Sequence, residues 1–154
     1  ARSDEWSLVH LDALHVVFRA APAAGAITRA GFDADRHADL LEALDPLPAH
    51  ALHTGAMTLY HLGWYAHAAE VFGRAVAVTP TYHEAWNMRG ACLALEGGRE
   101  LLQTGSTARL EEARMCFRKA LEIRPDYQPA RENLRRANRR LSGGRQPGYY
   151  LPQW

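Results

Sequence analysis

Several features that define other protein classes are scarce in this chain. It has two cysteines in 154 residues, Cys92 and Cys116, which are too few for a disulfide framework and favour a reducing compartment. No apolar run approaches the roughly 18 residues that a transmembrane helix needs. A single lysine, Lys119, stands among 18 basic residues, which we attribute to genomic base composition. The sequence therefore predicts a soluble globular protein with no membrane contact.

Targeting and catalytic motifs are also missing. The start, ARSDEWSLVHL, lacks the basic and apolar regions of a secretory signal. It lacks an initiator Met too, which leaves open that the chain is a fragment of a longer protein; the cytoplasm is the expected location. There is no Gly-rich phosphate loop, nucleophile elbow or paired-carboxylate motif. The sequence thus predicts no enzyme and no cofactor, and Cys92 is expected to be a small buried thiol.

Charge is divided unevenly along the chain. Residues 1–100 carry 7 Arg and 12 acidic residues, whereas residues 101–154 carry 11 basic and 5 acidic residues. Such a split is typical either of a basic half that meets an anionic partner or of ordinary solvated helix faces.

Composition predicts helices almost throughout, because Ala, Leu, Glu and Arg dominate and β-branched alternation is absent. We expect helices over about 4–20, 34–45, 48–62, 64–78, 83–96, 108–124 and 129–141. Gly63 is expected to cap one of them in the left-handed conformation, and Gly97-Gly98 to end another. The predicted fold class is all-α, built from short antiparallel helix pairs.

Two segments repeat one frame 45 residues apart. AAEVFGRAVAVTP (68–80) and ARMCFRKALEIRP (113–125) share Ala, Phe, Ala and Pro at identical spacing. The helix before each carries a large–small–large pattern, which is Leu52, Ala56 and Leu59 in one case and Trp86, Gly90 and Leu93 in the other. This pattern resembles the tetratricopeptide repeat, a helix–turn–helix unit of about 34 residues.

The resemblance implies a short right-handed solenoid of two full repeats and a C-terminal capping helix. Residues 1–48 are then N-terminal helices forming a degenerate repeat or cap, 49–141 the repeat region, and 142–154 a tail. Eleven extra residues, at about 97–107, separate the two helices of the second repeat as either an elongated helix pair or a projecting loop. Aromatic and apolar residues of the tail, such as Tyr149 and Trp154, are expected to dock on its own groove or on another molecule.

The family's usual role implies a non-enzymatic binding module, acting as scaffold, adaptor or assembly chaperone. Its first helices line a concave groove for a peptide or helix segment, here one with apolar anchors and an acidic stretch. The groove residues carried over are His50, His53, Met57, Tyr60, His61, Glu84, Asn87, Met88, Ala91, Leu95, Asn133, Arg136 and Arg140, with Glu132 and Arg139 beside them. Self-occlusion or oligomerisation is the competing interpretation of these side chains.

Two alternatives and one exclusion complete the predictions. Arg131, Arg135 and Arg139 form a stripe that suits nucleic acid or another polyanion, which steep salt dependence would favour. His50, His53 and His61 are too spread for a metal site but predict that partner binding changes between about pH 5.5 and 7.5, which flat affinity would contradict.

One subset of the family grips a C-terminal carboxylate with Lys and Asn from first helices. The corresponding places here hold His53, Met57 and Met88, so a heat-shock-chaperone adaptor of that kind is not expected.

Overall fold

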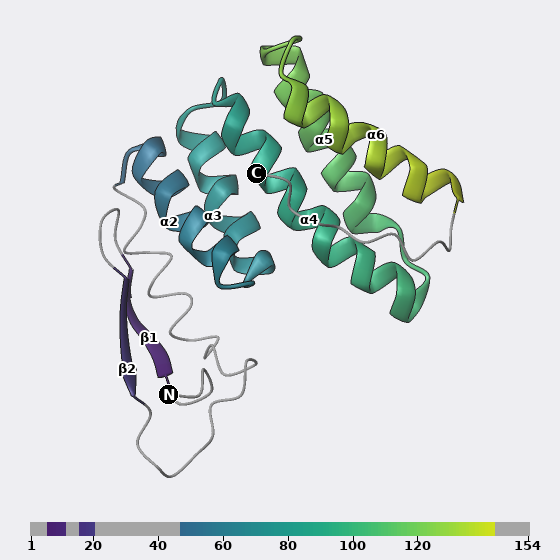
Figure 1. Cartoon of the computed structure of the whole chain (residues 1–154). Coiled ribbons are helices and arrows are strands. Elements are labelled where there is room, and N and C mark those ends of the chain that lie inside the picture. The colour runs from purple at the N-terminus through teal and green to yellow at the C-terminus, as the bar shows by residue number, and fades with distance from the viewer. Residues whose placement is uncertain (1–5, 12–15, 21–46, 144–154) are drawn as a thin grey trace.

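The computed structural model describes residues 6–11, 16–20 and 47–143 (Figure 1). A strand pair, β1 (Trp6–Leu11) and β2 (Val16–Ala20), comes first. Five helices follow, which are α2 (Ala49–His61), α3 (Tyr65–Val78), α4 (His83–Thr104), α5 (Ala108–Ile123) and α6 (Gln128–Gly143). The helix expected over 34–45 and the tail from residue 144 lie outside the described residues.

The helix expected over 4–20 is wrong. β1 and β2 pair antiparallel, with Trp6 opposite Ala20 and Leu11 opposite Val16, and the register shifts between Leu8 and His10. The segments WSLVHL and VVFRA are rich in aromatic and β-branched residues, which favour extended backbone over helix. The apolar residues of this segment also recur at a spacing near 3.6 residues, which is why the pattern predicts a helix.

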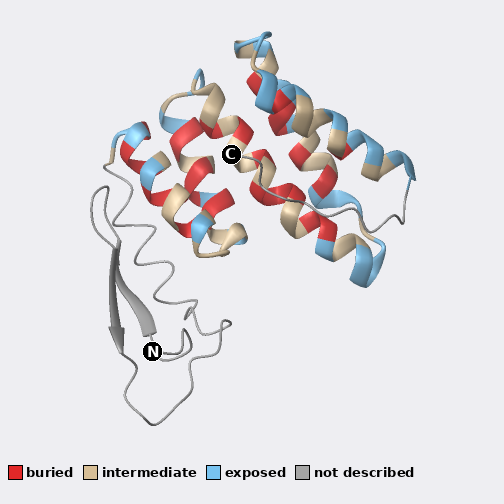
Figure 2. Ribbon diagram, viewed as in Figure 1, coloured by how far each residue is buried: buried red, intermediate tan, exposed pale blue. Residues whose placement is uncertain are grey.

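The helices pack as consecutive antiparallel neighbours, and α4 also contacts α6 (Figure 1). The repeated frame supplies the core: Phe72 of α3 and Phe117 of α5 are fully buried, as are the alanines that flank them, Ala68, Ala75, Ala113 and Ala120. Small alanines let backbones approach, and the phenylalanines fill the space between them. Buried residues lie along the helix contacts (Figure 2). The predicted all-α solenoid is confirmed for the helical region.

The same contact closes the turn into each new repeat. The carbonyl oxygen of Pro80 accepts a hydrogen bond from the indole Nε1 of Trp86 at 2.9 Å. Forty-five residues on, the carbonyl oxygen of Pro125 accepts one from Nη2 of Arg131 at 2.7 Å. Each proline thus ends a helix and anchors the first turn of the next one through its carbonyl group.

The expected stop at Gly97-Gly98 is wrong, because α4 continues to Thr104 and Gly105 ends it with φ +76°. A Cβ on Gly97 would lie 2.9 Å from the backbone nitrogen of Leu110. Gly97 therefore allows α5 to pack closely against α4, and it does so inside the helix. The insertion is resolved as an elongated helix pair, with only residues 105–107 between α4 and α5.

The last helix ends the stack with a polar side. Arg131, Arg135 and Asn138 stand where α4, 45 residues earlier, has its packing residues Trp86, Gly90 and Leu93, and all three are exposed. Ala130 and Ala137, on the other side of α6, are fully buried. Charged groups facing water where an internal repeat has packing residues make α6 a terminal cap.

Candidate functional site: the face of α2, α4 and α6

The first helices of the repeats and the cap form one surface, which we call the first-helix face. Its middle is apolar and partly covered: Met57, Tyr60 and Met88 are half-buried and pack on the core. Ala91 and Leu95 of α4 are also half-buried. Because α4 lies between the other two helices along the stack, its residues form the centre of this face. The structure thus brings the predicted apolar residues onto one surface.

His53 does not lie open on that face as expected. Its ring sits 5.3 Å from the Phe72 ring and 5.1 Å from the Tyr82 ring, between α2, α3 and the start of α4. Its Nε2 atom is buried and has no hydrogen-bond partner in the part of the chain that the structure describes. Burial lowers the pKa of His53 below its usual value, and the negative charge of Glu84 opposes this only in part. His53 therefore acts as a neutral packing residue, whereas His50 and His61 are exposed.

Asn87 is likewise placed in a helix contact. It is 4% exposed, and its Oδ1 accepts a hydrogen bond from Nδ2 of Asn133 at 3.1 Å. This bond joins α4 to α6 across the face. Two predicted groove residues thus stabilise the alignment of neighbouring first helices, since a buried amide requires such a partner.

Glu84 belongs to a network at the amino-terminal end of α4. Its Oε2 lies 3.0 Å from Nδ1 of His83, and the His83 ring meets the Tyr127 ring edge-on at 4.8 Å. Nη1 of Arg124 lies 3.3 Å from Nε2 of His83. The network ties the second repeat to the loop before α6, so Glu84 is already engaged inside the protein.

The arginines of α6 are mostly engaged by their own helix. Glu132 accepts hydrogen bonds from Arg135 and from Nε of Arg136, the latter at 3.1 Å. The Arg135 bond, followed by the Arg136 contact, lowers the pKa of Glu132. Arg131 bonds to Pro125. Arg139 is exposed, and no ion pair or hydrogen bond engages its side chain within the described residues. The predicted polyanion stripe therefore has one unengaged member.

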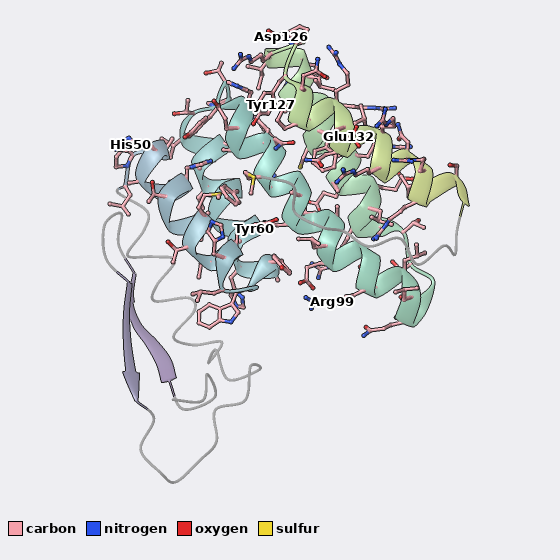
Figure 3. All side chains as sticks on the ribbon, in the orientation of Figure 1. His50, Tyr60, Arg99, Asp126, Tyr127 and Glu132 are labelled. Atoms are coloured by element: carbon pink, nitrogen blue, oxygen red, sulfur yellow. The ribbon has the colours of Figure 1, made fainter. Side chains whose placement is uncertain are left out.

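An aromatic group closes the face where α2 turns into α3. The Tyr60 ring lies 5.4 Å from the Tyr65 ring, and the Arg99 guanidinium lies 5.8 Å over Tyr65. Figure 3 places Tyr60 and Arg99 toward the same end of the molecule. Arg99 is absent from the predicted site, because the sequence predicts that this helix ends before residue 99.

Gly98 gives α6 a second point of contact with α4. A Cβ on Gly98 would lie 2.2 Å from Nη1 of Arg140, so the guanidinium lies directly over this glycine. The side chain of Arg140 thus reaches from α6 to α4, one turn before Leu102. The pairing of a glycine with a distant arginine left no signal in the sequence.

The cysteines lie in the core, as expected for Cys92. Both thiols are buried, and burial raises the pKa of Cys92 well above its usual value and that of Cys116 to about 11. They are therefore protonated and poorly reactive near neutral pH. No group of three His, Cys, Asp or Glu within the described ranges could hold a metal ion. None of the described helices combines the length and apolar character needed to cross a membrane.

Comparison with known proteins agrees with the helix geometry. A family model described as Tetratricopeptide repeat matches residues 105–127, which include α5. The solved structure of the first such domain of Spaghetti (RPAP3), bound to the HSP90 peptide SRMEEVD, is 28% identical. It aligns over 70% of this chain and 75% of its own, with a TM-score of 0.52. No curated protein sequence matches this chain.

Two further structures are similar. The first repeat domain of human RPAP3 is 26% identical over 75% of this chain and 84% of its own, with a TM-score of 0.53. The second domain of human RPAP3, in complex with the HSP70 peptide SGPTIEEVD, is 20% identical over 71% and 88%, with a TM-score of 0.52. The helical region therefore has a tetratricopeptide-repeat-type fold, as the sequence resemblance predicts. In function class it is a protein-interaction module.

Proposed function

We propose that the first-helix face binds a peptide segment of a partner protein, through apolar anchors near Met57, Met88 and Leu95. The observation that carries this is the row of half-buried apolar side chains across α2 and α4, beside the arginines of α6. Side chains that are partly covered lose little conformational freedom when a ligand completes their burial. Methionines also adapt their shape to an incoming side chain.

The charge beside this row selects the ligand. α6 carries five arginines and one glutamate between residues 128 and 143, so an acidic stretch of the ligand fits next to α6. The related domains whose structures hold HSP90 and HSP70 peptides bind segments that contain EEVD. In this chain the single lysine, Lys119, lies on α5 and pairs with Glu122 at 2.9 Å. We therefore do not expect a lysine to bind the C-terminal carboxylate of the ligand. The acidic residues that lie next to α6 are internal to the ligand. The role is that of a scaffold, adaptor or assembly chaperone.

The experiment is a pull-down that compares wild type with the double variant Met57→Glu/Met88→Glu. Two carboxylates in the apolar row repel an acidic ligand and remove its anchors, so a partner that binds this face is lost. The matched control is Met115→Glu, because Met115 is 63% exposed on α5, away from the row. A partner set that is identical for all three proteins contradicts the proposal.

Polyanion binding through α6 is the second candidate, and it depends on the exposed Arg139. Its signature is a linear fall of the logarithm of the binding constant with the logarithm of the salt concentration. The slope is close to the number of phosphates that the protein contacts. Because Arg139 is the one arginine of α6 whose side chain has no ion pair or hydrogen bond among the described residues, we expect a slope of about one for an RNA or DNA oligonucleotide in a salt titration. A slope of four or more would favour this candidate over the peptide.

A further inference from the structure

The turn that follows each repeat presents a tyrosine to a histidine of a first helix. After the first repeat, the Tyr82 ring lies 5.1 Å from the ring of His53. After the second, Tyr127, which comes 45 residues later, meets the ring of His83 edge-on at 4.8 Å. The two histidines differ in their polar contacts. Nε2 of His53 has no hydrogen-bond partner among the described residues, whereas both ring nitrogens of His83 are engaged.

The partners of His83 determine which of its nitrogens carries hydrogen. Nε2 lies 3.3 Å from Nη1 of Arg124, and a guanidinium can only donate, so Nε2 accepts. Nδ1 lies 3.0 Å from Oε2 of Glu84, and an ionised carboxylate can only accept, so Nδ1 donates. One form of the ring satisfies both contacts, and this is the neutral tautomer with its proton on Nδ1.

Protonation of His83 breaks one of these two bonds. The imidazolium carries hydrogen on both nitrogens, so an N–H of the ring then faces an N–H of Arg124, and two positive charges lie side by side. The bond to Glu84 becomes stronger at the same time, because its donor is now charged. A proton on the ring therefore keeps His83 bound to Glu84 and displaces Arg124.

Arg124 keeps other partners when His83 is protonated. Its Nε donates to Oδ1 of Asp126 at 3.2 Å, and its guanidinium lies over the Tyr127 ring, 5.7 Å from the ring centre. Both partners belong to the same turn between α5 and α6 as Arg124 itself, which Figure 3 places at one end of the molecule. Losing His83 therefore leaves the turn intact and removes a hydrogen bond that joins it to α4.

The charged and titratable groups around His83 come from α4 and from this turn. Glu84, on the same helix as His83, favours the imidazolium, and Arg124 opposes it. Asp126 is exposed and pairs with Arg124. Burial, followed by the charge of Glu84, raises the pKa of Tyr127 against the opposite effect of Arg124, so this phenol stays neutral near pH 7. Of these side chains, the imidazole is the type that changes charge between about pH 5 and 8.

We propose that His83 is a pH-sensitive latch that joins the start of α4 to the turn before α6 when neutral and releases that turn when protonated. The turn leads directly into α6, because the amide of Arg131 donates to the carbonyl oxygen of Tyr127 at 3.2 Å. The Asn87–Asn133 bond lies about one turn further along both helices, and its amide groups do not titrate. Acid therefore loosens the first turn of α6 and leaves the rest of the cap in place.

The first measurement is the tautomer of His83 in the full chain. It is read from long-range proton–nitrogen correlation spectra, in which His83→Phe identifies the signal of this ring. At about pH 7.5 the ring proton is expected on Nδ1. In Arg124→Leu this preference should be lost, because no donor then holds Nε2 as an acceptor. A wild-type ring whose neutral form carries its proton on Nε2 receives no bond from Arg124, and this result overturns the proposal.

The second measurement is a double-mutant cycle of His83→Phe and Arg124→Leu, followed as the Tm of the four proteins. Phenylalanine keeps the ring contact with Tyr127 and removes the nitrogens. At about pH 7.5 the loss of Tm in the double variant should be smaller than the sum of the single losses, and at about pH 5.5 this coupling should vanish or change sign. The effect of His53 is common to all four proteins and cancels. Equal coupling at both pH values refutes the latch.

Hydrogen exchange locates the effect within the cap. After correction for the intrinsic effect of pH, protection of the Arg131 amide should fall roughly fivefold between about pH 7.5 and 5.5 in wild type, relative to the amide of buried Ala137. It should not fall in Arg124→Leu, whereas His50→Gln, which removes an exposed histidine, should behave as wild type. A fall that is uniform along α6 shows general destabilisation and contradicts the latch. No ligand is used, so the latch and the proposed function are tested separately.

Discussion

Two glycines with different surroundings show how single atoms set the packing of this domain. Gly90 lies in α4, where a Cβ would come 2.6 Å from Cε1 of the buried Phe117 ring and 3.1 Å from the Ala113 carbonyl oxygen. At Gly73 in α3, the nearest atom to a Cβ is Nε of the Arg89 side chain, at 3.6 Å. The first glycine is required for close helix approach, while the second has room for a methyl group.

We therefore expect Gly90→Ala and Gly73→Ala to change stability in opposite directions. Gly90→Ala should lower the free energy of unfolding by about 1–3 kcal/mol through overpacking. Gly73→Ala should raise it by up to about 1 kcal/mol, because alanine favours helix over glycine. Urea denaturation at one pH measures both. A loss in Gly73→Ala as large as in Gly90→Ala would show that the contact distance does not govern the effect.

His53 makes the free energy of unfolding of the domain depend on pH. Because burial lowers its pKa in the folded protein, the unfolded chain binds the proton more readily. The stabilisation that a neutral His53 gives is complete above the pKa of this group in the unfolded chain, near 6.5. It is lost as the pH falls toward the lower pKa that His53 has in the folded protein. We expect the free energy of unfolding to fall between about pH 7 and pH 5. His53→Phe should flatten that fall, whereas exposed His50, replaced by Gln, should not. Equal slopes in wild type and His53→Phe would contradict this.

The same residue changes the pH hypothesis for binding. A His53 ring held between Phe72 and Tyr82 cannot charge without disturbing these contacts. Loss of partner binding at low pH is then expected to accompany loss of stability. Affinity that stays flat between about pH 5.5 and 7.5 would contradict this.

At the scale of helices and turns, two glycines end two helices in the same way. Gly63 follows α2 with φ +78° and Gly105 follows α4 with φ +76°, and a Cβ at either would meet no atom of the described residues within 4 Å. Any cost of an alanine here is consequently a cost of backbone conformation alone. This makes the pair a direct measure of what the left-handed conformation costs in a helix cap.

Gly63→Ala and Gly105→Ala should each lower the free energy of unfolding by about 1–2 kcal/mol, the cost of a left-handed residue with a Cβ. Gly143→Ala is the matched control, since it also has open space around it but no positive φ, and it should change stability by less than about 0.5 kcal/mol. Thermal or urea unfolding measures all three. If Gly63→Ala lowers the free energy of unfolding and Gly105→Ala does not, the elongated α4 is not stabilised by its glycine.

Single elements also show what sequence could predict. The second helices were found correctly because Ala68, Phe72 and Ala75 recur unchanged in spacing at Ala113, Phe117 and Ala120, and all are buried. The predicted end of α4 is wrong because the sequence does not distinguish a glycine that ends a helix from one that lets a neighbouring helix pack closely. Only the position of Leu110 beside Gly97 distinguishes the two. The β1–β2 pair was missed because its valines and aromatic residues also fit a helical spacing.

Some residues of the predicted site share one face of the domain, and others are engaged in contacts between helices. Met57, Met88, Ala91 and Leu95 share the first-helix face, because their spacing within each helix fixes the side on which they lie. His53 and Asn87 were expected there as ligand contacts and are instead engaged with Phe72 and Asn133. These partners come from other helices, 19 and 46 residues away in sequence, and such contacts leave no local pattern.

At the scale of the whole domain, the Asn87–Asn133 bond links the second repeat to the cap. Asn133→Ala leaves Oδ1 of buried Asn87 without this donor, and should lower the free energy of unfolding by about 1–3 kcal/mol. In a double-mutant cycle with Asn87→Ala, the coupling should be about 0.5–1.5 kcal/mol. Additive losses would show that the two amides stabilise their own helices independently. A single unfolding transition in every variant would show that cap and repeats unfold together.

The polar side of α6 determines what can stack on this end of the solenoid. Stacking another helix pair, or a second molecule, on that end would bury Arg131, which no carboxylate pairs with among the described residues, since Glu132 already receives Arg135 and Arg136. Burying unpaired charges in this way is strongly unfavourable. Head-to-tail filaments, the general hazard of modules built from stacking units, are therefore disfavoured at this end by the charged outer side of α6.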